Sequence, residues 1–101
     1  MELLTDELRS QLPPLYAQEK VKDPMVHAKF FTPWTHWTWY VTEGSEEEGD
    51  FIFFGYVAGD FGEWGYFSLN ELESVRGPGG LTIERDLHFT PKRKSEIPDF
   101  P

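Results

Sequence analysis

The stretch FIFFGYVA, residues 51–58, decides the fold because it is apolar on both of its alternating faces. A strand of this kind is covered on both sides and belongs in the interior of a sheet. The preceding stretch HWTWYVTE, residues 36–43, alternates instead and places Trp37 and Trp39 on one face. Between the two lies Gly44–Asp50, a polar segment typical of a hairpin tip. These residues predict a central antiparallel hairpin.

Two short helices and three more strands are expected around this hairpin. Thr5 is a suitable N-cap for a helix that Pro13–Pro14 ends. Ser68 and Glu71 form a capping box for a second helix. The order of elements is typical of the α+β class, with a mainly antiparallel sheet of about five strands and two short helices on one face. The three further strands are expected over residues 25–31, 64–67 and 83–89.

The length of 101 residues suits one domain. We expect a single domain over residues 1–101, with a core at about residues 3–90 and an irregular tail over residues 91–101. The chain begins MELLTDE, without an apolar run of signal length. No stretch approaches the roughly 18 apolar residues that a membrane span needs. These features indicate a soluble cytoplasmic protein that does not bind a membrane.

The net charge of −9 is concentrated in the middle of the chain. No Lys or Arg lies between Lys29 and Arg76, whereas that stretch holds nine of the 18 acidic residues. The remainder has nine acids and nine bases, and so it is neutral. Because nucleic acids are polyanions, a protein of this charge is not expected to bind them directly. The same charge favours a basic protein as the partner.

Motifs that indicate catalysis or metal binding are lacking. The chain has no cysteine, and its three histidines, at positions 27, 36 and 88, have no metal-ligand spacing. Glycine-rich phosphate-binding motifs and the GxSxG nucleophile motif are also missing. The sequence therefore predicts no catalytic residue, no metal and no cofactor. The sequence disfavours an enzyme, and enzymatic activity is kept as an alternative.

Eight short motifs spread along the chain point to a known family. Together they resemble the bacterial family catalogued as domain of unknown function 2958, and the resemblance extends to about residue 97. It implies a small protein carried by bacteria, phages and plasmids, often beside antirestriction genes, with no established activity and no catalytic residues to transfer. The chain departs from the usual pattern at His36, at Thr82 and in Lys92–Lys94. The motifs are WTWYVTE (37–43), LPPLY (12–16), DP (23–24), KFFTP (29–33), FGYV (54–57), GYFSL (65–69), ELE (71–73) and IERD (83–86).

The acidic middle is the leading candidate for a binding surface. Carboxylates held on a rigid sheet can imitate the spaced phosphates of DNA and occupy a basic groove on a nucleic-acid-processing or defence protein. The alternative is a solvated surface without a partner. Trp34 and Trp64 are expected to be partly exposed and to act as interface anchors. The expected acidic binding residues are Asp60, Glu63, Glu71 and Glu73, near regular elements, and Glu46, Glu47 and Glu48 at the tip.

Arg85 shares its strand parity with Ile83, and Glu43 shares its parity with Trp39, so both side chains are expected to point inward. Since an unpaired buried charge is costly, Arg85 is predicted to pair with Glu43 or, failing that, with Glu71 or Glu73. The alternative is an anion clamp.

Two other functions are also compatible with the sequence. One is a small-ligand binder or enzyme with a pocket lined by Tyr40, Trp64, Tyr66 and Arg85. The other is a structural homodimer formed through an edge strand, because an open sheet of five strands leaves unpaired edges.

Overall fold

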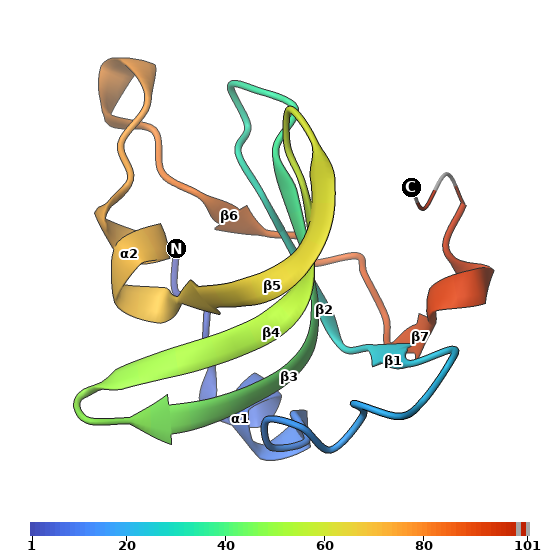
Figure 1. The fold of residues 1–101 in the computed structure, drawn as a ribbon. Coiled ribbons are helices and arrows are strands. Elements are labelled where there is room, and N and C mark those ends of the chain that lie inside the picture. The colour runs from blue at the N-terminus through green and yellow to red at the C-terminus, as the bar shows by residue number, and fades with distance from the viewer. Residues whose placement is uncertain (99, 101) are drawn as a thin grey trace.

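The structure, a computed structural model that describes residues 1–98 and 100, is built on a five-stranded antiparallel sheet with the strand order β5-β4-β3-β2-β6 (Figure 1). Two short helices complete the fold, and the α+β class is confirmed. A second sheet of two strands lies beside the first. The strands of the large sheet are β2 (Ala28–Phe31), β3 (Thr38–Glu47), β4 (Asp50–Ala58), β5 (Gly62–Ser68) and β6 (Glu84–Arg85).

The apolar stretch 51–58 lies within β4, which pairs with β3 on one side and with β5 on the other. Its glycine, Gly55, lies opposite Val41. A Cβ atom at Gly55 would lie 1.9 Å from the backbone oxygen of Tyr40, so no larger residue fits without moving β3. The prediction of an interior strand is thus confirmed.

The helices α1 (Asp6–Gln11) and α2 (Leu69–Ser74) cover one face of the sheet, which we call the inner face. Both predicted N-cap residues are confirmed, but among the described residues the Glu71 side chain does not make the return bond of the predicted capping box. The Thr5 hydroxyl accepts the N–H of Leu8 at 3.1 Å, and the Ser68 hydroxyl accepts the N–H of Glu71 at 3.2 Å. The inner face carries the main core, whose least exposed members are Leu3, Phe30, Val41, Phe53 and Ile83.

A β-bulge at Thr42 shifts the alternation of side chains along β3. Odd-numbered residues lie on the inner face before the bulge and on the outer face after it. Val41 pairs with Gly55, but Glu43 pairs with Phe54, so Thr42 is an extra residue without a partner in β4. Because side chains alternate along a strand, one inserted residue moves Glu43 to the outer face, which is the face away from α1 and α2.

The hairpin tip is tighter than the sequence indicates. The polar segment 44–50 is not a loop, because β3 continues to Glu47 and β4 begins at Asp50. Only Glu48 and Gly49 form the turn, and both have positive φ angles, 45° and 84°. A two-residue turn of this kind matches the natural twist of a hairpin and fixes its register.

The tail is more ordered than expected. Within it, β7 (Lys92–Arg93) pairs with β1 (Met25–Val26), and a 3-10 turn, η2 (Lys94–Glu96), follows. The Ser95 hydroxyl donates to the Asp23 carboxylate at 2.6 Å. The prediction of an irregular tail is wrong for these residues, and its positions 99 and 101 lie outside the described residues.

Two of the predicted strands are also shorter than expected. The strand expected over 83–89 is reduced to β6, and the one expected over 25–31 is interrupted at His27. A further 3-10 turn, η1 (Pro78–Gly80), lies between α2 and β6. In the part of the chain that the structure describes, no helix is long and apolar enough to cross a membrane.

Candidate functional site

The β3–β4 hairpin and α2 are joined by the carboxylate of Asp50. One of its oxygens, Oδ1, accepts the backbone N–H groups of Phe51 at 2.7 Å and Asn70 at 3.0 Å. The other oxygen, Oδ2, accepts the hydroxyl of Ser68, which is the N-cap of α2. These bonds, led by the one from Ser68, lower the pKa of Asp50. The hairpin and α2 therefore have a fixed relative position.

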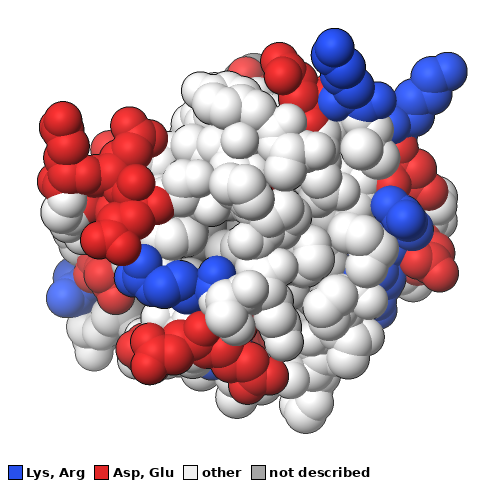
Figure 2. Space-filling view, turned by 90° about the horizontal axis from the view of Figure 1, so that it is seen from below, with Lys and Arg blue, Asp and Glu red and all other residues white. Residues whose placement is uncertain are grey.

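Five exposed glutamates lie on the two elements that Asp50 joins, and we call this set the acidic end. Seen from below, carboxylates gather at the left edge of the molecule, the side on which the hairpin lies in Figure 1 (Figure 2). Only Glu46 has a cation partner among the described residues, at 2.9 Å from Arg9. The acidic end consists of Glu46, Glu47 and Glu48 on the hairpin and Glu71 and Glu73 on α2.

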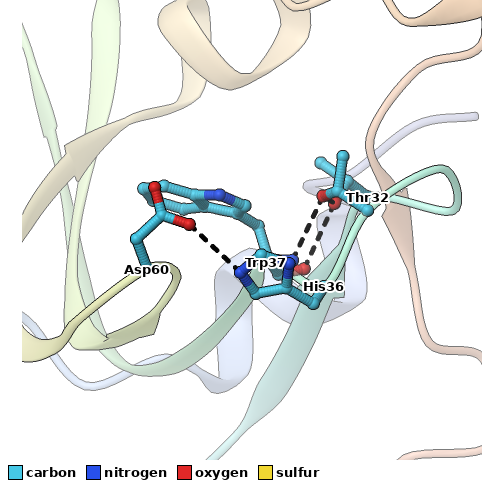
Figure 3. Close-up of polar contacts among 5 residues, drawn as sticks. Thr32, His36, Trp37 and Asp60 are labelled. Atoms are coloured by element: carbon cyan, nitrogen blue, oxygen red, sulfur yellow. Dashed lines mark hydrogen bonds and ion pairs between the residues drawn. The ribbon is translucent and has the colours of Figure 1, made fainter.

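Two of the acids predicted to belong to the binding surface, Asp60 and Glu63, lie elsewhere. They follow the opposite end of β4, and nine strand residues separate the two ends by roughly 25 Å. Asp60 lies 3.2 Å from the Nε2 atom of His36, and both side chains are exposed (Figure 3). The expected acidic surface is therefore divided, and only five of its seven acids are held together.

The two tryptophans predicted as anchors have different surroundings. Trp34 is half-buried and packs against the core, and its indole ring occupies the space beside Gly77. Trp64 is 40% exposed on the outer face, where its ring stacks on Phe54 with centroids 6.0 Å apart. Neither residue lies at the acidic end. Of the two, Trp64 has the greater surface available to a partner.

The predicted pair of Arg85 with Glu43 does not form. Glu43 is only 3% exposed, and its two oxygens accept the N–H groups of Tyr16 at 2.8 Å and Gln18 at 2.7 Å. The bulge at Thr42 is the physical reason, because it turns Glu43 to the outer face. The buried carboxylate instead holds the connector between α1 and β1 against the sheet.

Arg85 lies on the inner face, opposite to the face of Glu43, since it pairs with Phe30 of the inner face. Its side chain lines a hollow of about 470 Å³ beside α1, together with Glu7 and His27. Its Nε atom is buried and has no hydrogen-bond partner among the described residues. The fallback pairing with a glutamate of α2 is also not formed among those residues. Burial lowers the pKa of His27, so the neutral imidazole is favoured in this hollow.

A second hollow, of about 460 Å³, lies over the outer face. Its walls include the rings of Tyr16, Phe54, Trp64 and Tyr66, and Glu43 also lines it. Partial desolvation of the phenol raises the pKa of Tyr66, and its hydrogen bond with Tyr16 raises that pKa further. The volume is within the range of small-molecule sites. The hollow is a candidate for a planar ligand that stacks on aromatic rings.

The pocket predicted from Tyr40, Trp64, Tyr66 and Arg85 is not assembled. Trp64 and Tyr66 share the outer hollow, but Arg85 lines the other hollow. Tyr40 is buried, and the ring of Phe100 lies 4.9 Å from its ring centroid. The tail residue therefore covers this part of the outer face.

Sequence reasoning missed Asp50 and the connector residues Tyr16 and Gln18. Asp50 follows a Glu-Gly turn and lies 18 residues before Ser68, the N-cap of α2, and nothing in its local pattern indicates that it binds that cap. The φ angle of Tyr16 is 75°, an uncommon conformation for a residue other than glycine. No group of three or more metal-ligating side chains is present in the described part of the chain.

Replacing Asp50 by asparagine is expected to destabilise the protein in a pH-dependent way. The folded-state pKa of Asp50 is below the ordinary value of 3.8, so its charge contributes stability above that pH. This contribution is lost as the pH falls through the lower folded-state pKa. Urea unfolding at neutral and acid pH should show that the gap between wild type and Asp50→Asn is largest at neutral pH and shrinks in acid. A gap that does not change with pH would contradict this role.

The comparisons with known proteins give a family and no function. The model of the family described as "Protein of unknown function (DUF2958)" matches residues 3–97. The search of curated proteins and the search of solved structures found no match.

Proposed function

The chain belongs to the DUF2958 family of proteins of unknown function, and we propose that it is a non-enzymatic binding protein whose acidic end docks on a basic protein. One observation supports this most strongly. The Asp50 carboxylate joins the hairpin to the N-terminus of α2, so glutamates from two elements keep fixed positions relative to one another. A surface that imitates an array of phosphates needs such fixed spacing.

The charges of four glutamates at the acidic end are not neutralised by cations of the described residues, and this also supports the proposal. Among the described residues, Glu47, Glu48, Glu71 and Glu73 form no ion pair, and all four are exposed. Uncompensated charge of one sign raises the rate of association with a partner of opposite sign and disfavours like-charged partners. The partner class is therefore a protein with a lysine- and arginine-rich groove.

Such a groove is typical of proteins that bind nucleic acid. We propose a nucleic-acid-processing or defence protein as the partner, which would place this chain in the cytoplasm and in the setting of mobile genetic elements. In this scheme the chain competes with nucleic acid for the groove and does not itself bind nucleic acid.

A titration with an octa-arginine peptide tests where a basic ligand binds. In ¹⁵N-labelled protein, the amides of residues 46–50 and 70–74 are expected to shift most, because they surround the acidic end. The shifts should weaken strongly when salt rises from about 50 to about 200 mM, since the length over which exposed charges are screened falls from about 14 Å to about 7 Å. Equal shifts at Asp60 and Glu63, or no effect of salt, would contradict the proposal.

A second function is favoured by the outer hollow, with its volume of about 460 Å³ and its aromatic walls. The alternative is a binder of a small planar ligand that stacks on Trp64 and Tyr66. A fluorescence screen of heteroaromatic compounds, read from the tryptophans and repeated with Trp64→Ala, distinguishes the two functions. Only a ligand whose binding depends on Trp64 would support the alternative.

A further inference from the structure

The free edge of β5 is an unprotected template for another strand. β5 pairs with β4 on one side only, and within the described sheet it is the terminal strand. It has seven residues, of which Gly62, Glu63, Trp64 and Tyr66 are exposed. Natural edge strands are usually short, or carry Lys, Pro or a bulge that prevents pairing. The opposite edge strand, β6, is protected by its length of two residues, whereas β5 has only Glu63 as a charge.

We propose that a second copy of this chain pairs with β5 in antiparallel orientation, about a two-fold axis through Gly65. Gly65 is the middle residue of β5, so this register gives every residue of the strand a partner. It also pairs aromatic residues across the axis, because Trp64 comes opposite the partner's Tyr66 on the outer face. Cross-strand aromatic pairs stabilise antiparallel sheets.

The glycine at this axis has no evident role within one protomer. No heavy atom lies within 4 Å of the position that a Cβ would occupy at Gly65, and its φ angle is outside the left-handed region. Glycine is thus required there neither by packing nor by backbone conformation. In a strand interior, glycine weakens the strand and often marks a site where another backbone approaches closely. A two-fold axis supplies that approach.

The same register accounts for the most exposed apolar side chain. Phe61 is 86% exposed and lies just before β5. In the proposed dimer it comes beside the partner's Leu69, at the start of α2. Glu63 comes opposite the partner's Phe67, so the register brings no two carboxylates directly opposite one another. Because each protomer carries a net charge of −9, repulsion between the two is long-range, and added salt should favour the dimer.

Sedimentation equilibrium over a range of protein and salt concentrations tests this dimer. The mass is expected to rise from 11.8 kDa toward twice that value, and further at higher salt. A charge swap then tests the register. The double variant Trp64→Glu, Tyr66→Glu places like charges opposite one another, and we expect its dissociation constant to rise at least about tenfold. The double variant Trp64→Lys, Tyr66→Glu places opposite charges there and should recover most of that loss.

A chain that stays at 11.8 kDa under all conditions would overturn the proposal, as would equal weakening by both double variants. Circular dichroism shows whether both variants keep the fold. Hydrogen exchange of the wild-type protein gives an independent test that needs no variant. Amide protection on β5 should increase with protein concentration, and protection that is independent of concentration would also overturn the dimer.

Discussion

Replacing Glu43 by leucine is expected to lower the free energy of unfolding by about 2–5 kcal/mol, because two partly buried N–H groups lose a charged acceptor. The carboxylate is 3% exposed and binds the backbone of Tyr16 and Gln18 at 2.8 and 2.7 Å. A leucine side chain accepts no hydrogen bond, so the connector would lose both bonds that hold it to Glu43. Urea unfolding gives the free energy, and exchange of the two amides identifies the groups that are released.

The conservative variant Glu43→Gln separates hydrogen bonding from packing. Its amide oxygen can still accept one N–H group, so we expect a loss between those of wild type and Glu43→Leu. The control is Glu48→Gln at the exposed turn, where a change within about 0.5 kcal/mol is expected. A loss below about 1 kcal/mol for Glu43→Leu would show that the two hydrogen bonds do not hold the connector.

Local signals were sufficient for much of the fold. The caps at Thr5 and Ser68 each depend on hydrogen bonds within four residues, and both were predicted. The apolar composition of the stretch 51–58 was sufficient to predict an interior strand, although only its inner-face residues are fully buried, and Ile52, Phe54 and Tyr56 on the outer face are half-buried. The choice of α+β follows from these elements and their order along the chain.

The bulge at Thr42 shows what parity alone cannot predict. The alternation at Trp39 and Val41 continues without interruption to Glu43 in the sequence, yet Thr42 has no partner in β4. A bulge depends on the register between two strands, and a single-strand pattern does not contain it. This one residue explains why the predicted pair of Glu43 with Arg85 was wrong.

The candidate site was predicted only in part for a similar reason. The five glutamates were identified, but their division from Asp60 and Glu63 depends on which end of β4 each set adjoins. The tight turn at Glu48–Gly49 was not predicted within the polar segment 44–50, because glycine after an acidic residue also occurs in longer loops. Contacts such as Ser95 with Asp23, 72 positions apart, have no local signature.

Neutralising the acidic end is expected to cause the largest loss of binding. The variant with four substitutions, Glu47→Gln, Glu48→Gln, Glu71→Gln and Glu73→Gln, removes four exposed carboxylates that have no ion pair among the described residues. If each contributes about 0.2–1 kcal/mol to attraction, as exposed charge pairs do, affinity for a basic partner falls by about fourfold to nearly a thousandfold. The fold should be unaffected, because none of the four side chains has an ion-pair or hydrogen-bond partner among the residues that the structure describes.

A matched control keeps the same total charge and changes only its position. Four acids outside the acidic end, Glu19, Asp60, Glu63 and Glu84, are replaced by their amides, so that both variants have a net charge four units less negative than the −9 of the wild type. Any effect of net charge is then equal in the two proteins. A difference between them reports the location of the carboxylates.

The most direct measurement is isothermal titration of these two variants and the wild type with a basic nucleic-acid-binding protein at low salt. If the acidic end is the docking surface, the control binds nearly as tightly as wild type, whereas the other variant loses most of its affinity. Equal losses in the two variants would mean that the partner senses only total charge, and the proposed site would be contradicted.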